Sequence, residues 1–62
     1  MKKVRKLKDY TIVEFSPKDQ LNHNVSSPYG CILNDEMEFA SDLREIDMEC
    51  GSVQECIDFI GC

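Results

Sequence analysis

The chain has 62 residues with a formal net charge of −5, and it is 42% hydrophobic and 31% charged. This much apolar material excludes wholesale disorder, while the length excludes more than one small domain. A core of this size only just offsets the entropy lost on folding, so a deep catalytic pocket is not expected.

The chain begins with a basic segment, residues 1–8, which carries five Lys or Arg side chains and no acid. Residues 9–62 carry all twelve acids against two cations, a charge of −10. We take residues 1–8 as a basic N-terminal segment, which extends the first strand or frays as a tail, and residues 9–62 as the single small domain. The acidic body should repel phosphates and attract basic protein surfaces.

Residues 10–15 predict the clearest strand, because they are rich in β-branched and aromatic side chains and end at a Ser-Pro breaker. Apolar side chains occupy both faces, so we expect this strand to be central or covered on both sides. Residues 16–19 have the form of a capped helix start, with Ser16 as the cap and Asp19 at the third helical position. We expect a single helical turn or a capped loop there, followed by a polar loop over residues 22–28.

Residues 29–40 predict a β-hairpin, because a strand-like run is followed by an Asn-Asp turn and by alternating polar and apolar side chains. Residues 44–50 alternate again and predict a further strand. A rival interpretation is one helix over residues 36–50, since apolar residues spaced four, three and four apart form one helical face. Like charges four residues apart, and acids near the helix C-terminus, disfavour that helix only slightly. We favour the strands and keep the helix as the alternative.

The last predicted element is a helix over residues 52–60. Ser52 and Glu55 form a capping box, and Gly61 ends the helix. The buried stripe of this helix consists of Val53, Cys56, Ile57 and Ile60, widened by Phe59. Together the elements predict a small α+β fold, an antiparallel β-meander of three to four strands with one C-terminal helix packed on one face.

Four cysteines allow three interpretations. The basic N-terminus lacks the apolar region of a secretory signal, so we expect a cytoplasmic protein whose cysteines are free thiols. We expect Cys56, on the buried stripe of the C-terminal helix, to act as a small apolar core residue. Export would favour two disulfides instead. A zinc site is the third possibility, but the gaps of eighteen, five and five residues do not match the usual paired spacing. We therefore expect no metal and no cofactor at Cys31, Cys50, Cys56 and Cys62.

No catalytic constellation is visible. The single histidine, His23, lies in a polar stretch without a nucleophile and an acid assembled around it, and we expect a solvated side chain. A glycine-rich phosphate loop, a zinc-protease motif and calcium-loop spacing are missing from the sequence, as is an apolar stretch of the roughly 18 residues that a membrane span needs. We expect a protein that is not an enzyme, that lies in the cytoplasm of the host cell and that has no membrane partner.

The strongest positive signal is a run of acids over residues 35–49, opposed by the single cation Arg44. On strands or on a helix, such a run presents closely spaced carboxylates, which can imitate the phosphates of a nucleic acid. We expect these carboxylates to bind the basic surface of a protein partner, such as a nucleic-acid-binding protein, through Glu36, Glu38, Asp42, Glu45, Asp47 and Glu49. In size and charge, though without a shared motif, the chain resembles the small inhibitors made by phages and mobile elements, including anti-CRISPR proteins and DNA mimics. The resemblance implies a non-enzymatic, anti-defence role.

Two other functions fit parts of the sequence. In one, the chain is a ribosomally synthesised precursor peptide, whose N-terminal strand pairs with a maturation enzyme and whose cysteines are modified. In the other, the chain is a small nucleic-acid-associated regulator that binds through residues 1–8. The acidity of residues 9–62 disfavours such direct binding to nucleic acid.

Overall fold

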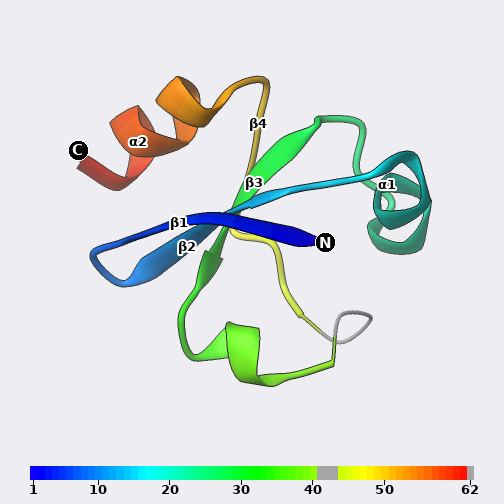
Figure 1. Ribbon diagram of the computed structural model, residues 1–62, viewed down its shortest axis with the longest axis horizontal. Coiled ribbons are helices and arrows are strands. Elements are labelled where there is room, and N and C mark those ends of the chain that lie inside the picture. Colours follow the sequence, from blue (N-terminus) through cyan, green and yellow to red (C-terminus); the bar gives the residue numbers. More distant parts are fainter. Residues whose placement is uncertain (41–43, 62) are drawn as a thin grey trace.

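The computed structural model describes residues 1–40 and 44–61 of the chain. It confirms the predicted α+β class, because four antiparallel strands form a meander in the order β1-β2-β3-β4 and a C-terminal helix packs on one face (Figure 1). The elements are, in chain order, β1 (Lys2–Leu7), β2 (Tyr10–Glu14), α1 (Pro17–His23), β3 (Tyr29–Leu33), the 3-10 turn η1 (Glu36–Glu38), β4 (Met48–Cys50) and α2 (Val53–Gly61).

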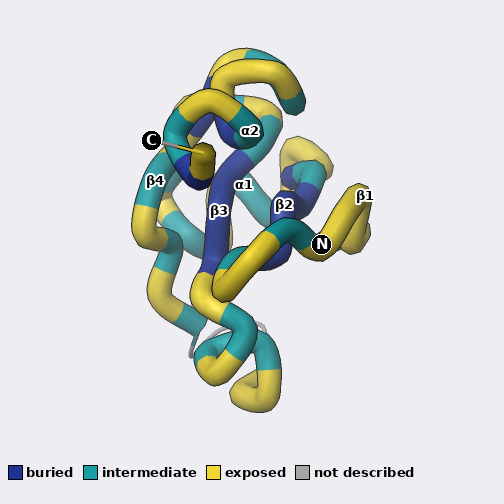
Figure 2. Tube along the Cα trace, turned by 90° about the vertical axis from the view of Figure 1, so that its left-hand side faces the viewer, coloured by how far each residue is buried: buried dark blue, intermediate teal, exposed yellow. Residues whose placement is uncertain are grey.

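Strand β2 lies inside the sheet and is covered on both faces, as its two-sided apolar pattern predicted. Ile12 faces α2 and belongs to one buried cluster, whereas Val13 belongs to a second cluster on the opposite face. Both side chains are 0% exposed. In Figure 2 the buried residues are concentrated along β2 and β3. The sheet therefore separates two small cores, one under α2 and one under the loops of the other face.

The basic N-terminal segment forms a strand of its own at the edge of the sheet. Strand β1 pairs antiparallel with β2, and a two-residue turn in which Lys8 has a φ of 55° connects them. The register shifts between Lys3 and Arg5, so that Val4 forms a β-bulge. Residues 2–6 are exposed, as expected for an edge strand in which four of the six side chains are charged. The segment neither lengthens β2 nor frays.

Helix α1 is longer than the single turn predicted, but it begins as predicted. The N–H of Asp19 donates to the Ser16 hydroxyl, and the N–H of Ser16 donates to the Asp19 carboxylate, both at 3.2 Å. The amino group of Met1 lies 3.1 Å from the same carboxylate. Its hydrogen bond lowers the pKa of Asp19 from the usual value, and the hydrogen bond from Ser16 acts in the same direction.

The predicted hairpin over residues 29–40 is only half present, because residues 36–40 form no strand. Asn34 is held by the turn between β1 and β2, and the chain then winds into η1, where Met37 packs on the core. The side chain and backbone amide of Asn34 form hydrogen bonds with Thr11, Lys8 and Asp9. The rival helix over residues 36–50 is also wrong, since η1 is the only helical turn in the described part of that range.

The predicted strand over residues 44–50 is present only at its end, as β4. The backbone N–H of Asp47 still donates to the Cys31 carbonyl at 2.9 Å. The N–H of Leu33, however, donates to the Asp47 carboxylate at 3.1 Å. If β4 extended further toward its N-terminus, this N–H would instead donate to a backbone carbonyl of β4. A short side chain therefore ends the pairing of β3 and β4.

Helix α2 confirms the predicted C-terminal helix, with a difference at its cap. The Ser52 hydroxyl accepts the N–H of Glu55 at 3.2 Å, as a capping box requires. The Glu55 carboxylate accepts the N–H of Gly51 at 2.9 Å, one residue before the expected donor. The stripe facing the sheet consists of the buried Cys56 and Ile60 and the half-buried Val53, Ile57 and Phe59.

Candidate functional site

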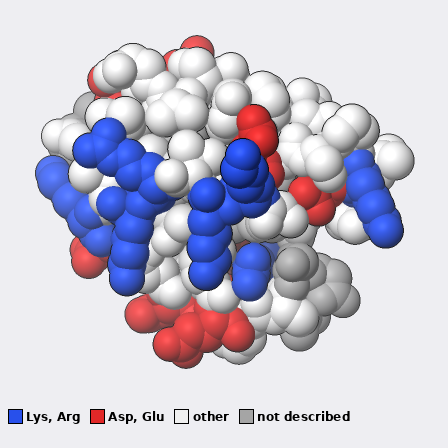
Figure 3. Space-filling view, in the orientation of Figure 1, with Lys and Arg blue, Asp and Glu red and all other residues white. Residues whose placement is uncertain are grey.

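The acids of the predicted binding surface come from two segments that cover the same face of the sheet. Met37 in η1 and Ile46 in the segment before β4 both pack against the buried cluster of Val13, Phe15 and Ile32. This is the face opposite α2. In Figure 3, acidic side chains gather at the lower edge of the molecule, in the region of η1, below a row of Lys and Arg side chains.

Three of the six predicted acids lie at this surface with their carboxylates available. Glu38 and Glu45 are exposed, and Glu36 is half-buried. Asp35, the residue before η1, is exposed as well and adds a carboxylate that the predicted set did not contain. The predicted residue Asp42 lies outside the described residues.

Two other predicted acids are occupied by the fold itself. The Asp47 carboxylate accepts the N–H of Leu33, the last residue of β3. The Glu49 carboxylate accepts the N–H of Ser26 at 3.0 Å, in the loop that leads into β3. These carboxylates therefore sit at opposite ends of β3, and each supports the backbone there.

The acids around η1 and before β4 form no ion pair in the described part of the chain. Arg44 is the only cation within the acidic run, and its Nε donates to the backbone carbonyl of Phe39 at 2.8 Å. Within residues 1–40 and 44–61, the one ion pair joins the amino group of Met1 to Asp19. The acids around η1 and before β4 therefore have no directly paired cation among the described residues.

A cationic surface lies beside the acidic one. Four β1 residues, from Lys3 to Lys6, line one side of an open groove of about 450 Å³. Met37 and Glu38 of η1 contribute to its lining as well. The groove is therefore mixed in charge, with three β1 cations and the acidic η1 turn along its walls.

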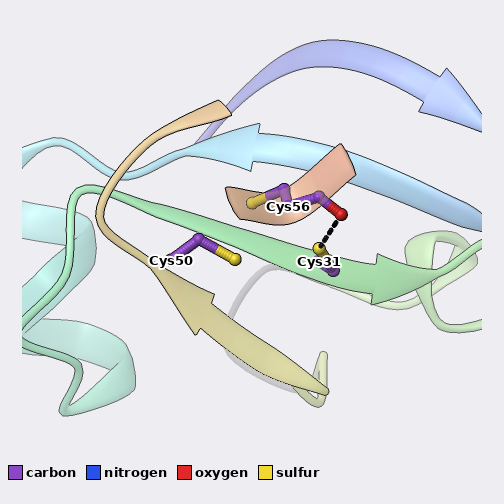
Figure 4. Close-up of side chains that lie close together, drawn as sticks. All are labelled: Cys31, Cys50 and Cys56. Atoms are coloured by element: carbon purple, nitrogen blue, oxygen red, sulfur yellow. Dashed lines mark hydrogen bonds between the residues drawn. The ribbon is translucent and has the colours of Figure 1, made fainter. Parts of the chain in front are cut away.

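Three of the four cysteines meet in the core under α2 (Figure 4). Cys31 comes from β3, Cys50 from β4 and Cys56 from α2, and their Sγ atoms all lie within 4.8 Å of one another. The Cys31 thiol donates to the Cys56 carbonyl at 3.9 Å. Burial raises the pKa of the Cys31 thiol from 9.0 to about 11, and burial raises the pKa of Cys56 as well. Cys62 lies outside the described residues.

Sequence spacing could not reveal this cluster, because each of its cysteines belongs to a different element. The usual signal for a cysteine site is two ligands on one tight turn. Here the strand register brings Cys31 and Cys50 to the same face of the sheet. Cys56 lies on the side of α2 that packs against this face, so it joins them in one buried cluster.

His23 is the remaining residue that we considered for catalysis. It is half-buried at the end of α1, with its ring centre 6.2 Å from that of Phe15. The imidazole ring is therefore partly exposed and lies beside the core residue Phe15. Among residues 1–40 and 44–61, no nucleophile or acid is hydrogen-bonded to its imidazole ring.

None of the helices described is both long and apolar enough to cross a membrane. Comparison of the chain with protein-family models, with curated proteins and with solved structures found no match.

Proposed function

We propose that this chain is a non-enzymatic protein-interaction module, whose acidic surface binds the basic surface of a partner. The observation that carries the proposal is the set of exposed carboxylates around η1 and before β4, which form no ion pair within the described residues. Glu38 and Glu45 are exposed, and Arg44, the nearest cation in sequence, is turned to a backbone carbonyl instead. Charge complementarity of this kind steers association and selects partners.

The finer form of the proposal is an inhibitor of the phage or mobile-element type, acting in the cytoplasm of a host cell. Such an inhibitor would occupy a groove lined with Lys and Arg that otherwise binds nucleic acid. Carboxylates held on a folded surface suit this role, because Arg and Lys form charge-assisted hydrogen bonds with carboxylate and phosphate alike. Asp47 and Glu49 support the scaffold in this proposal, and the exposed acids contact the partner.

The test compares two double variants of equal net charge. Glu38→Gln with Glu45→Gln removes two carboxylates from the proposed surface. Glu14→Gln with Asp58→Asn removes two from β2 and α2, elsewhere on the molecule. Binding to a lysine-rich peptide is measured by isothermal titration at low and moderate salt.

We expect the first double variant to bind at least about tenfold more weakly than the second, and the intact chain to lose affinity as salt is raised. Equal losses in the two variants would mean that only net charge matters, and would refute the proposed surface.

A second candidate function is supported by the position of β1. Its cations stand on an ordered edge strand rather than on a frayed tail, so they form a fixed array that could contact the phosphates of a nucleic acid. Binding of a short DNA duplex, measured by fluorescence anisotropy, should then weaken more in Lys3→Gln than in Lys18→Gln, which has the same net charge. Equal affinity of the two variants would contradict this candidate.

The precursor-peptide alternative requires accessible cysteines. Cys31, Cys50 and Cys56 are at most 1% exposed in the folded chain. Their burial favours the interaction module over a peptide that matures by cysteine modification.

A further inference from the structure

The cysteine cluster under α2 points to a property that is independent of the charged surfaces. We propose that Cys31, Cys50 and Cys56 form a binding site for one thiophilic divalent metal ion with a filled d shell, of the Zn²⁺ and Cd²⁺ class. The three sulfurs come from β3, β4 and α2 and lie close together in Figure 4.

The distances between the sulfurs suit a shared ion. A zinc–thiolate bond is about 2.3 Å long, so three sulfurs around one ion lie roughly 4 Å apart. The Sγ atoms of the cluster already lie within 4.8 Å of one another. Small rotations of three side chains would therefore complete the site without moving the backbone.

The strand register disfavours a disulfide between the two strand cysteines. Cys50 lies opposite Tyr29 and Cys31 lies opposite Met48, so the two cysteines are diagonal neighbours on one face of the sheet. Such diagonal neighbours are typically about 7–8 Å apart between Cα atoms, whereas a disulfide usually needs about 4.4–6.8 Å. A metal ion bound to both sulfurs can bridge Cys31 and Cys50 at this diagonal separation, whereas a single sulfur–sulfur bond is too short for it.

The donor set selects the class of ion. Thiolate sulfur prefers soft or borderline ions, and no carboxylate or histidine from the described residues belongs to the cluster, so Mg²⁺ and Ca²⁺ are excluded. The surroundings of the cluster are apolar, with Ile12 and Ile60 in the same buried cluster. Because buried net charge is costly in such surroundings, the thiophilic ion that leaves the smallest net charge is favoured. Three thiolates with a divalent ion leave one negative charge, whereas a monovalent ion leaves two.

Binding exchanges protons for metal. Three S–H bonds break, three metal–sulfur bonds form, and three protons leave to solvent, with no change in oxidation state. Because the cysteines are at most 1% exposed, an ion reaches them only when α2 lifts from the sheet or while the chain folds. The ion then joins α2 to β3 and β4 and should stabilise the fold.

The test uses Cd²⁺, because Cd–thiolate charge-transfer bands absorb in the ultraviolet. The reduced full-length chain is unfolded in urea and refolded with increasing Cd²⁺. We expect the absorbance to saturate at one ion per chain, native mass spectrometry to show one Cd²⁺ with the loss of three hydrogens, and the melting temperature to rise.

The variants Cys31→Ala, Cys50→Ala and Cys56→Ala should each weaken Cd²⁺ binding by more than about tenfold, since each removes one of three ligands. Cys62→Ala is the matched control, because it removes a cysteine that the proposed site does not use, and this variant should still bind one ion. Cadmium NMR of the intact chain counts the sulfur ligands directly, so the proposal can be judged even if an alanine variant does not fold.

Several results would overturn the proposal. The first is a refolded chain that holds no bound Cd²⁺ although equimolar Cd²⁺ is present. The second is a cadmium NMR shift that indicates fewer than three sulfur ligands. The third is an equal loss of Cd²⁺ affinity in Cys62→Ala and Cys56→Ala. A chain that is two hydrogens lighter and cross-linked between Cys31 and Cys50 would show a disulfide instead.

Discussion

The ring of Phe15 lies directly against Gly30, so closely that a β-carbon on Gly30 would come within 2.8 Å of the ring edge. The Met48 carbonyl, at 3.0 Å, closes the space from the β4 side. Phe15 is 4% exposed and belongs to the core opposite α2. The glycine therefore provides the space in which an aromatic ring packs against β3 near the start of the strand.

We expect Gly30→Ala to destabilise the protein by about 1–3 kcal/mol, because the added methyl group overpacks a buried site. Gly61→Ala is the control, since a methyl group added there would meet no atom within 4 Å, and it should change the stability by less than about 0.5 kcal/mol. Urea unfolding monitored by circular dichroism measures both. Equal stabilities of the two variants would mean that the ring moves aside without cost.

The turn between β1 and β2 holds Lys8 in the left-handed region, with a φ of 55°. Because this conformation strains a residue with a β-carbon, Lys8→Gly should stabilise the protein by about 1 kcal/mol. Lys6→Gly removes the same charge from the extended part of β1 and should destabilise it by about 0.5–1 kcal/mol. Thermal unfolding of both variants checks the opposite signs, and a melting temperature that falls in both would contradict the strain.

The carboxylate of Asp47 has a structural role at the N–H of Leu33. We expect Asp47→Ala to cost about 0.5–1.5 kcal/mol, since it leaves this amide without its acceptor. Glu45→Ala removes an equal charge two residues earlier and should cost less than about 0.5 kcal/mol. Hydrogen exchange of the Leu33 amide gives a second readout, which should accelerate only in Asp47→Ala.

The raised pKa of Cys31 makes stability depend on alkaline pH. In the unfolded chain this thiol ionises near 9.0, whereas in the fold its pKa is about 11. The stabilisation is therefore fully present below about pH 9 and is lost as the pH rises toward about 11, because the unfolded state then releases its proton first. Urea unfolding at several pH values should show a shallower decline in Cys31→Ala than in the intact chain. Parallel declines would refute the assignment to this thiol.

Local signals in the sequence were sufficient for the elements that depend on neighbouring residues. The β-branched run of β2, the Ser16 cap and the apolar stripe of α2 each occupy a short segment, and each forms where it was predicted. Strand β1 was harder to predict, because it lies at the edge of the sheet and four of its six side chains are charged. Its sequence therefore lacks the apolar pattern by which a strand is usually recognised.

The errors came from contacts between distant residues. Asn34 is drawn toward the turn at Lys8, some 26 positions earlier, which converts the expected second hairpin arm into η1. Asp47 uses its side chain on the backbone of β3, which shortens β4. The cysteine cluster likewise depends on the register of β3 and β4, which composition and spacing do not specify.

The bulge at Val4, together with the row of cations along β1, has a consequence for the behaviour of the protein at high concentration. An open strand edge invites a second molecule to add on, which is a route to fibres. When the β1 edges of two molecules approach each other, their Lys and Arg side chains meet and repel. The irregular register at Val4 also interrupts the ladder of backbone hydrogen bonds that a second molecule would need in order to pair with β1. We therefore expect β1 to resist edge-to-edge association with a second molecule, although it has only one neighbouring strand in the sheet.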